Sequence, residues 1–512
     1  MKTLTHSVFG ARHADQRLWH VHGVKERFWS GRRERHALEV FHAAEKQVPA
    51  YKDFLKKHAI DAHRINTWED FQQVPATSKK NYLSRYSMED LAWNGTLAKP
   101  LVFTATSGTT GEPFYFPRTS QLDWQSSVAH ELFLQNGFVG GKEKGPTLVI
   151  VAFGMGVWIG GLLTYKAFEI AGIRGGYPIS ILPTGINKKE IFNALKKLAP
   201  HFHQTIITGY APFIKDIIDE SPAQGIDFKK LNARFIFAAE AFTESFRDYI
   251  AEHARIKNIY RDTMNIYGSA DIGTMAYETP AAILIRRLLM KNKHAFHSVF
   301  SGIEKTPTLA QYNPLFIAFE APRGEILLTG DSAIPLVRYA IGDHGGILSF
   351  GEMMAKLKEQ GIDFYQEAKR AAIDPSIGEL PFVYIYERAD MATTLYGLQI
   401  YPEVIREALL RPSCRTALTG KFTMITKFDE KQNQYLEINV ELRRGGRKKR
   451  ALEKLAQVAI IDTLRAKSSE FRELSDHLKE RAIPRVVLWP AEHPLHFKPG
   501  AKQKWVKKEE GS

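Results

Sequence analysis

The feature that most constrains the fold is an alternation of short apolar runs with amphipathic stretches between about residues 100 and 350. The apolar runs include "TLVIVAF", "TIITGY", "ARFIFAAE" and "NIYGS", and the stretches between them include "KKEIFNALKKLA" and "TESFRDYIAEHARI". Parallel strands need long crossover connections, which are usually helices. The alternation therefore predicts an α/β core of parallel strands covered by helices.

The segments on either side of this core carry different patterns. The first hundred residues are expected to be mainly helical, because "RRERHALEVFHAAEKQV" (32–48) and "TWEDFQQV" (67–74) have helix-like apolar spacing. After about residue 320, "GEILLTG", "PLVRYAIGD" and "GGILSF" favour a turn-rich, more antiparallel part. The last 120 residues restart the alternation of strands and helices, which predicts a small α+β domain from about residue 391.

Length and cysteine content narrow the class of protein. A chain of 512 residues is long enough for two or three domains. Its single cysteine, Cys414, excludes an intramolecular disulfide and a thiolate cluster for structural zinc. The N-terminus lacks the apolar core of a secretory signal, so we expect a cytoplasmic protein. Residues 145–165 are uncharged and long enough to span a bilayer, but their β-branched start and glycines favour a buried strand and a Gly-rich loop.

The formal charge of +14 fits an anionic substrate, a nucleic acid or an acidic membrane surface, and does not choose among them. The basic run "RRGGRKKR" at 443–450 is interpreted as a solvated loop, and the chain lacks the interleaved aromatics of an RNA-binding motif. The pairs "HVHG" (20–23) and "HFH" (201–203) lack metal-ligand spacing. No GxSxG elbow is present and Cys414 has no adjacent His, so a protein nucleophile is not expected.

The segment "TSGTTGEP" (106–113) is the strongest candidate for an anion-binding loop. Its two glycines let backbone amides turn toward an anion, and its hydroxyls add hydrogen-bond donors. The loop differs from the GxxxxGK[ST] nucleotide loop, since it lacks the lysine and has Glu112 after its last glycine. A polar β-hairpin is the alternative interpretation. The candidate ligand-binding residues are Thr106, Ser107, Gly108, Thr109, Thr110 and Gly111.

"TSGTTGxP" resembles the phosphate loop of the adenylate-forming superfamily, which includes acyl-CoA synthetases, firefly luciferase and peptide-synthetase adenylation domains. Four further segments resemble that superfamily in the same order: "YGSADIG" (267–273), "PLVRYAIGD" (335–343), "ERADMATTLYGLQIYP" (387–402) and "PGAKQKWV" (499–506). "AFGMGVWIGGLLTYKAFEIAG" and "IFAAEAFTESFR" are most similar to phenylacetate-CoA ligases and their capsule-biosynthesis relatives. The resemblance covers about residues 45–510.

This resemblance implies a large domain with layered parallel sheets over residues 1–389, including the helical start, and a small mobile α+β domain over 391–512. Asp390 would be the hinge between them. The glycine that precedes the hinge in the family is Glu387 here, so the hinge is expected to be stiffer.

The resemblance also implies a nucleotide site. Tyr267 would stack on adenine in a loop that includes Gly268 and Ser269, and Asp343 would accept the ribose hydroxyls. Arg388 would approach the ribose and phosphate. Glu240 lies in the stretch that resembles the adenine-lining loop, and the role of its side chain is left open.

Asp271 occupies the position of the family's Mg²⁺-coordinating glutamate, one methylene shorter. A carboxylate with phosphate oxygens is an ordinary ligand set for Mg²⁺. The neighbouring threonine of the family is Ala270 here, which removes a hydroxyl that reaches the α-phosphate. Glu112 would repel a triphosphate, so we expect it at the solvent edge with Arg118 or another basic group nearby.

Lys502 is the predicted catalytic lysine, with Lys504 as the substitute. Its ammonium would bridge the acid and the α-phosphate and stabilise the transition state; the alternative is a solvated basic tail. The predicted acyl pocket consists of Phe153, Met155, Trp158 and Gly160, with an apolar wall and room for a flat ring. A core strand and turn is the alternative for that segment.

The resemblance thus implies an enzyme that uses ATP and Mg²⁺ to convert an organic carboxylic acid, expected to be aromatic, into acyl-AMP with release of pyrophosphate. The acyl group would then pass to a thiol, that of coenzyme A by resemblance. Transfer to an amine or to the phosphopantetheine of an acidic carrier protein is the alternative. A different class, a non-catalytic relative that binds a nucleotide or acyl ligand, is motivated by Glu112, Ala270 and Glu387.

Overall fold

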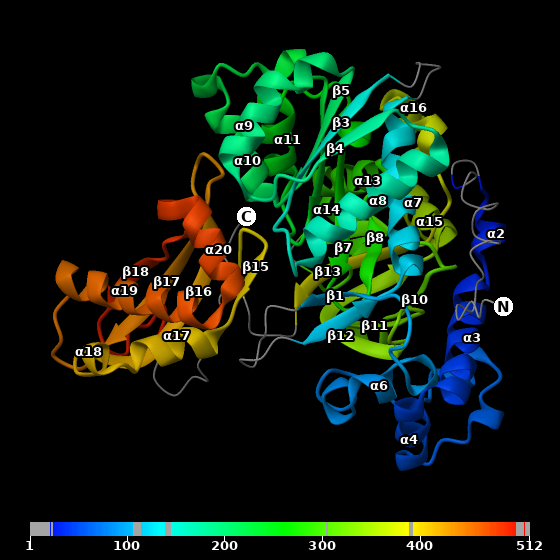
Figure 1. Ribbon diagram of the computed structural model, residues 1–512, viewed down its shortest axis with the longest axis horizontal. Helices are drawn as coiled ribbons and strands as arrows, with labels where there is room; N and C mark the ends of the chain where they lie inside the picture. The colour runs from blue at the N-terminus through cyan, green and yellow to red at the C-terminus, as the bar shows by residue number, and fades with distance from the viewer. Residues whose placement is uncertain are drawn as a thin grey trace.

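The computed structural model describes residues 21, 24–105, 114–138, 145–303, 306–388, 393–497 and 506, and for 387 and 388 it describes the backbone. The described residues form one large mixed sheet, a helical layer on each side of it and a smaller C-terminal part (Figure 1). None of the helices in the described residues is both long and apolar enough to cross a membrane.

The large sheet has 11 strands in the order β10-β11-β12-β13-β9-β8-β7-β6-β5-β3-β4. Its parallel half consists of β3 (Thr147–Ala152), β4 (Ile179–Leu182), β5 (Gln204–Gly209), β6 (Ala233–Ala238) and β7 (Thr263–Ser269). Its antiparallel half consists of β8 (Gly273–Tyr277), β9 (Thr308–Gln311), β10 (Ile317–Glu320), β11 (Glu325–Gly330), β12 (Leu336–Leu348) and β13 (Phe382–Arg388). The predicted change from parallel to antiparallel strands is confirmed.

Strand β3 shows why both faces of the sheet are covered. All six of its residues are buried. Leu148 and Ile150 pack with helices α9 (Lys188–Lys197), α10 (Ala211–Glu220) and α11 (Glu244–His253), whereas Val149 and Val151 pack with α7 (Ser120–Gly137) and α8 (Ile159–Gly175). Successive side chains of a strand point to opposite faces, so an uninterrupted apolar strand requires helices on both. The predicted buried strand within 145–165 is therefore confirmed.

The antiparallel half is covered at β9 and β13 by α13 (Pro280–Lys291), α14 (Lys293–Val299), α15 (Phe350–Glu359) and α16 (Phe364–Arg370). The short helix α12 (Ile259–Asp262) directly precedes β7. The N-terminal helices are α2 (Glu26–Trp29), α3 (Arg32–Gln47), α4 (Pro49–Lys57), α5 (Trp68–Phe71) and α6 (Met88–Leu91). The helical start is therefore confirmed for residues 24–100. The segments "PLVRYAIGD" and "GGILSF", both predicted to lie in the antiparallel part, contribute residues 336–343 and 345–348 to the single 13-residue strand β12. The strand continues through Gly345, where a Cβ would lie 1.8 Å from the carbonyl oxygen of Tyr384 on β13.

The C-terminal part contains strands and helices in alternation. β16 (Leu418–Phe428) pairs antiparallel with β17 (Gln434–Leu442), and β17 pairs parallel with β18 (Arg485–Trp489). A separate hairpin is formed by β14 (Thr393–Leu395) and β15 (Leu398–Ile400). The helices are α17 (Pro402–Leu409), α18 (Pro412–Arg415), α19 (Arg450–Lys467) and α20 (Ser469–Leu478). This mixture confirms the predicted α+β class, while the boundary at 390 lies outside the described residues.

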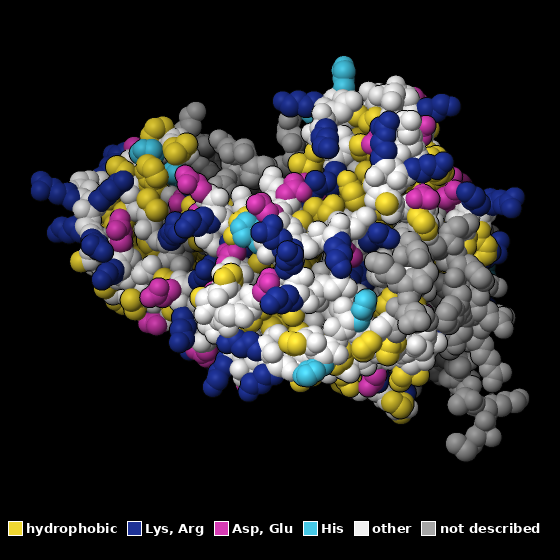
Figure 2. Space-filling model, turned by 90° about the horizontal axis from the view of Figure 1, so that it is seen from above, with side chains coloured by type: hydrophobic (Ala, Val, Ile, Leu, Met, Phe, Trp, Pro, Cys, Tyr) yellow, Lys and Arg dark blue, Asp and Glu magenta, His cyan; other side chains and the backbone are white. Residues whose placement is uncertain are grey.

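The basic run at 443–450 is exposed at every position, as predicted for a solvated loop. Lys and Arg side chains are spread over the face shown in Figure 2 rather than gathered in one patch. On this face the charge therefore does not mark a nucleic-acid site.

Candidate active site

Two residues predicted to bind a nucleotide meet where β7 and β12 approach each other. The hydroxyl of Tyr267, near the end of β7, donates a hydrogen bond of 2.5 Å to Oδ2 of Asp343 on β12. Asp343 is buried and stands opposite Arg388 of β13 in the antiparallel register. Gly268 has no room for a side chain, because a Cβ would lie 2.8 Å from the carbonyl oxygen of Gly273. Three strands thus bring these predicted residues to one place.

Asp271 lies in the turn between β7 and β8, and only 6% of it is exposed. Its Oδ2 accepts a hydrogen bond of 2.7 Å from the hydroxyl of Tyr339, and its Oδ1 lies 3.5 Å from Nζ of Lys79. Its backbone N–H donates to Oγ of Ser269 at 3.2 Å. Burial, together with the charge of Asp271, raises the pKa of Tyr339, so the tyrosine acts as a neutral donor.

Lys79 is a residue that sequence reasoning missed. Its segment is tied to β12, since the N–H of Thr77 donates to the carbonyl of Arg338 at 3.1 Å and the N–H of Ala340 donates to the carbonyl of Thr77 at 2.8 Å. Nothing in the sequence of this stretch indicated a partner almost 200 residues away. A cation therefore lies beside the carboxylate predicted to bind Mg²⁺.

Asp271 is the residue at this site that was predicted to bind a metal ion. Within the described part of the chain, no three His, Cys, Asp or Glu side chains come together as a metal-binding group. Asp271 offers carboxylate oxygens at a buried position. Mg²⁺ is commonly held by one or two carboxylates with substrate phosphates and waters. The residues therefore fit Mg²⁺ together with a bound phosphate chain and do not form a complete cage.

The predicted acyl-pocket segment is tightly packed. Phe153 is buried and meets the ring of Tyr210 edge-on, with 5.2 Å between centroids. A Cβ on Gly160 would lie 3.5 Å from the ring of Phe153, whereas a Cβ on Gly161 would lie 2.4 Å from the carbonyl oxygen of Gly154. Met155 is half-buried, and its sulfur would lie 2.5 Å from that same Cβ on Gly161. The glycines thus bring helix α8 against the preceding loop.

A small cavity lies between this segment and the C-terminal part of the chain. Gly154, Trp158, Ile186 and Tyr210 line one side, and Tyr396, Leu398, Glu470, Glu473 and Leu474 line the other. Nε1 of Trp158 donates a hydrogen bond of 3.2 Å to Glu473. Burial, and secondly the charge of Glu473, raise the pKa of Glu470 to about 8. Of the four residues predicted to form the acyl pocket, Trp158 lines this cavity, and Phe153, Met155 and Gly160 do not.

Glu240, whose role the sequence left open, points toward the C-terminal part. Its carboxylate accepts a short hydrogen bond from the N–H of Gly397 and one of 2.9 Å from Nε2 of Gln434. Burial raises the pKa of Glu240 to about 8, opposed by the hydrogen bond from Gln434. The structure thus gives its side chain two partners, both from the part of the chain beyond residue 392.

Comparisons with known proteins provide a fold relationship. No protein-family model and no curated protein matches the chain. Among solved structures, a 2-hydroxyisobutyryl-CoA ligase in complex with 2-HIB-AMP and CoA in the thioesterification state aligns over 98% of this chain and 91% of its own, with 16% identity and a TM-score of 0.59. The chain therefore has the same fold as this CoA ligase.

Two further solved structures align less closely. The same ligase in an open conformation, with 2-HIB-AMP and CoA, aligns over 93% of this chain and 90% of its own, with 15% identity and a TM-score of 0.49. The amide bond synthetase McbA from Marinactinospora thermotolerans aligns over 90% of this chain and 79% of its own, with 12% identity and a TM-score of 0.41.

Strands β1 (Val102–Ala105) and β2 (Tyr115–Arg118), which flank the predicted phosphate loop in the sequence, pair with each other in antiparallel register. The N–H of Ala105 donates to the carbonyl of Val157 at 3.0 Å, so the end of β1 lies beside the predicted acyl-pocket segment. Nζ of Lys79 lies 5.8 Å from the ring centre of Phe116 on β2. The residues on either side of 106–113 therefore lie near Val157 and Lys79.

Several predicted residues lie outside the described residues. They are the phosphate-loop residues 106–113 with Glu112, the hinge residue Asp390, and both candidate lysines, Lys502 and Lys504. Arg118, expected near Glu112, forms a buried pair of 2.6 Å with Asp123. The roles of these residues stay predictions.

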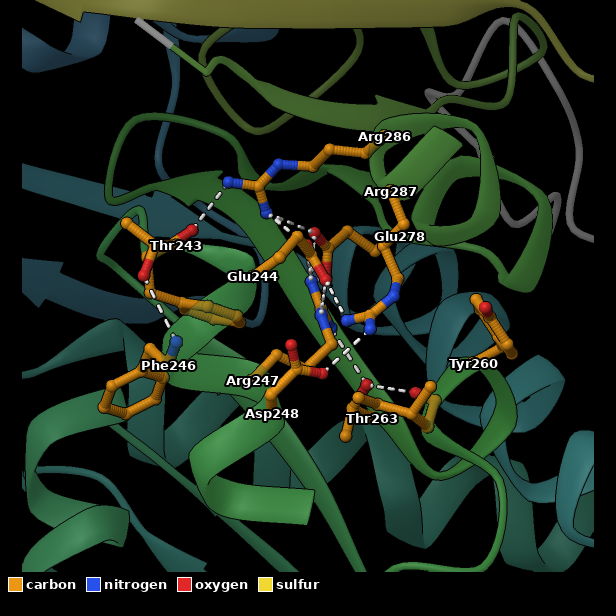
Figure 3. A network of polar contacts seen from close by, with 12 residues as sticks. Thr243, Glu244, Phe246, Arg247, Asp248, Tyr260, Thr263, Glu278, Arg286 and Arg287 are labelled. Atoms are coloured by element: carbon orange, nitrogen blue, oxygen red, sulfur yellow. Dashed lines mark hydrogen bonds and ion pairs between the residues drawn. The ribbon is translucent and has the colours of Figure 1, made fainter. Parts of the chain in front are cut away.

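A buried charge network lies behind the loop that carries Glu240 (Figure 3). Arg247 on α11 is fully buried and donates to Glu244 at 2.9 Å and to Glu278 at 2.7 Å. Arg286 on α13 donates to Glu244 at 2.8 Å, and Arg287 donates to it at 3.0 Å. Buried charges are tolerated when each is paired and hydrogen-bonded, so this network fixes α11 and α13 relative to each other.

The same network anchors the loop backbone. Arg286 donates a hydrogen bond of 2.6 Å to the carbonyl of Phe242. The carboxylate of Glu278 accepts from the N–H of Asn265 at 3.0 Å, and the side chain of Asn265 donates to the carbonyl of Glu240 at 3.0 Å. The backbone of the loop is therefore held by residues of the large sheet, while the buried carboxylate of Glu240 points toward the C-terminal part.

Proposed function

We propose that this chain is an adenylate-forming ligase. It uses ATP and Mg²⁺ to convert an organic, aromatic carboxylic acid into acyl-AMP with release of pyrophosphate, and then passes the acyl group to the thiol of coenzyme A. The observation that carries the proposal is the meeting of Tyr267 and Asp343, with Arg388 opposite in the register and Asp271 in the next turn. Tyr267 offers a ring face, Asp343 offers an acceptor for a diol, and Asp271 offers a carboxylate in the turn that follows the same strand as Tyr267.

Each residue has a defined task in the first half-reaction. Tyr267 offers its ring to the purine, and Asp343 accepts hydrogen bonds from the ribose hydroxyls. Asp271 would hold Mg²⁺ together with the phosphates, and the ion would neutralise charge on the phosphate chain. Lys502 stabilises the negative charge that develops as the acid's oxygen attacks the α-phosphorus. The bond between the α-phosphorus and the pyrophosphate oxygen breaks in that step.

In the second half-reaction the sulfur of a thiolate attacks the acyl carbon and the bond to the AMP oxygen breaks. The activated acid is a mixed anhydride, so no covalent bond to the protein is needed. We place the large domain at 1–389 and the small domain at 391–512, with Asp390 as the hinge that changes between the two steps. The 2-hydroxyisobutyryl-CoA ligase structure with the TM-score of 0.59 is in the thioesterification state. This similarity supports assigning the present arrangement to acyl transfer.

A second candidate acceptor is an amine. Glu470 and Glu473 line the cavity beside Trp158, and two carboxylates next to aromatic rings suit an ammonium group better than an anionic thiolate. Glu470, with its pKa raised to about 8, is also suited to exchange a proton with an amine near neutral pH.

The experiment is a measurement of pyrophosphate release from ATP and Mg²⁺ with a panel of aryl, aryl-acetyl and fatty acids, each with CoA, with a panel of amines, or with neither. Release that depends on one acid and rises with CoA supports the ligase, and release that rises only with an amine supports the second candidate. The Lys502→Ala variant should abolish release, with Lys504→Ala as the matched control. Nucleotide binding without release for any acid would favour the non-catalytic relative.

A further inference from the structure

Strand β12 carries a β-bulge directly before the tyrosine that contacts Asp271. Between the pairs Leu328–Tyr339 and Gly330–Leu336, β12 has two residues where β11 has one. The second of these two residues is Arg338, whose φ is 45°. A large side chain on a left-handed backbone is strained, so the surrounding structure must hold it in place. Bulges of this kind re-aim side chains and are common beside active sites.

Two buried threonines hold the backbone of the bulge from opposite sides. On the β11 side, the N–H of Arg338 donates a hydrogen bond of 2.9 Å to Oγ1 of Thr329. On the other side, Oγ1 of Thr77 donates to the carbonyl of Val337 at 2.8 Å, in addition to its two backbone hydrogen bonds to β12. The hydroxyls thus supply hydrogen bonds where the irregular register interrupts the ladder between β11 and β12.

The side chain of Arg338 fastens the same bulge to two further segments. Its Nε and Nη2 each lie 3.0 Å from a carboxylate oxygen of Glu320 on β10, and its Nη1 donates to the carbonyl of Val74. Arg338 and Glu320 are both buried. A two-pronged contact between guanidinium and carboxylate fixes geometry as well as charge. The strained residue is therefore held by its backbone and by its side chain.

The residue that follows the bulge, Tyr339, points at Asp271. It is 1% exposed, and its hydroxyl donates a hydrogen bond of 2.7 Å to Oδ2 of Asp271. The other oxygen, Oδ1, lies on the side of Lys79, at 3.5 Å from Nζ. The hydroxyl thus holds the carboxylate in one orientation and occupies Oδ2, so the oxygen that remains for a metal ion is Oδ1.

We propose that Tyr339 is a positioning residue for the carboxylate of Asp271, and that the bulge at Arg338 aims it there. The inference rests on the proposed function, because it takes Asp271 as the ligand of Mg²⁺. Tyr339 acts through Asp271 and touches no reacting atom. Groups that hydrogen-bond a metal ligand set its orientation, and their loss typically weakens metal binding or activity by about 10-fold to 100-fold.

The first test measures metal binding without turnover. Tyr339→Phe removes the hydroxyl and keeps the ring, and the matched control is Tyr86→Phe, which removes a hydroxyl that donates to Asp53 at 2.8 Å in the N-terminal helices. The probe is Mn²⁺, followed by electron paramagnetic resonance in the presence of the ATP analogue that has a methylene group between its α- and β-phosphorus atoms.

We expect Tyr339→Phe to raise the Kd for Mn²⁺ by about tenfold, and Tyr86→Phe to leave it within about twofold of the parent protein. Unchanged Mn²⁺ binding in Tyr339→Phe would overturn the proposal. Equal Mn²⁺ binding by the parent protein and Asp271→Asn would overturn it as well, because Asp271 would then not be a metal ligand.

Exchange of pyrophosphate into ATP separates positioning from a merely structural role. Tyr339→Phe should need about tenfold more Mg²⁺ for half-maximal exchange and reach a rate within about twofold of the parent protein once Mg²⁺ saturates. A rate that stays low at saturating Mg²⁺, with an unshifted half-saturation, would assign Tyr339 to stability alone. If the parent protein shows no exchange with any acid but Mn²⁺ binding behaves as expected, the proposed function fails and the positioning role stands.

A double-mutant comparison tests the bulge. Thr329→Val removes the acceptor for the N–H of Arg338 and keeps the side-chain shape. It should raise the Kd for Mn²⁺ by about threefold in the parent protein and by less than about twofold in Tyr339→Phe, because the bulge acts through the tyrosine. Equal effects in the two backgrounds would refute the link between the bulge and Tyr339.

Discussion

Replacing Glu278 by Gln would remove one of the two carboxylates that neutralise Arg247 in the buried network of Figure 3. Arg247, Arg286 and Arg287 carry three positive charges, which are paired with the carboxylates of Glu244, Glu278 and the more exposed Asp248. Loss of the Glu278 carboxylate therefore leaves Arg247 with Glu244 as its charged partner, and it also weakens the acceptor for the N–H of Asn265.

The magnitude follows from burial. Arg247 and Glu278 are both 0% exposed, and breaking a buried pair by removing one partner costs about 3–5 kcal/mol. Arg287→Gln is the matched control, since it removes one charged member of the same network, a partner of Glu244. Arg287 is 19% exposed and its other partner, Asp248, is 55% exposed, so this change should cost about 1 kcal/mol.

The assay is calorimetric thermal unfolding of the parent protein and the two variants at one pH and salt concentration. Because a protein of this size need not unfold in two states, the comparison uses the midpoint of the transition that contains the large domain. Glu278→Gln should lower that midpoint several times more than Arg287→Gln does. Equal shifts, or a larger shift for Arg287→Gln, would refute the reasoning from buried charge.

Further predictions concern the site itself. Tyr267→Phe removes the hydrogen bond to Asp343 and should raise the KM for ATP by about tenfold, the effect of losing a hydrogen bond to a charged group; an unchanged KM in steady-state kinetics would separate this pair from nucleotide binding. Asp271→Asn should raise the Mg²⁺ concentration needed for half-maximal pyrophosphate release, and a Mg²⁺ titration with an unchanged midpoint would remove Asp271 from the metal site. Glu240 has a pKa of about 8 in the folded protein against an ordinary value of 4.5, so its proton favours the folded state: this stabilisation is complete below about pH 4.5 and is lost as the pH rises through about 8. Unfolding midpoints between pH 5 and 9 should fall less steeply in Glu240→Gln than in the parent protein, and parallel profiles would contradict the raised pKa of Glu240.

The elements were largely predictable, because their signals are local. The apolar run of β3 indicates a strand that is buried on both faces. The helical spacing of apolar residues in α9 and α11 indicates which side of each helix is buried. The length of β12 was not predictable, because its glycines suggest a break. Only the close approach of Gly345 to β13 explains why the strand continues through them.

The site was predictable where it lies within motifs and not elsewhere. Tyr267 and Asp343 meet as expected from their motifs, although 76 residues separate them in the chain. Lys79 and Glu473 were missed, because each becomes relevant only through a partner far away in the sequence, Asp271 for the first and Trp158 for the second. The role of Glu240 required the fold for the same reason, since its partners belong to the C-terminal part.

The proposed function requires a carboxylate oxygen of the acid to bond to the α-phosphorus of ATP. The most direct measurement uses the acid found in the panel with both carboxylate oxygens labelled with the heavy isotope ¹⁸O, followed by mass spectrometry of the nucleotide product after complete acyl transfer. The AMP should carry one labelled oxygen, because the carboxylate oxygen stays on the α-phosphorus when the acyl carbon is attacked. Unlabelled AMP, or ADP with the label in inorganic phosphate, would contradict it.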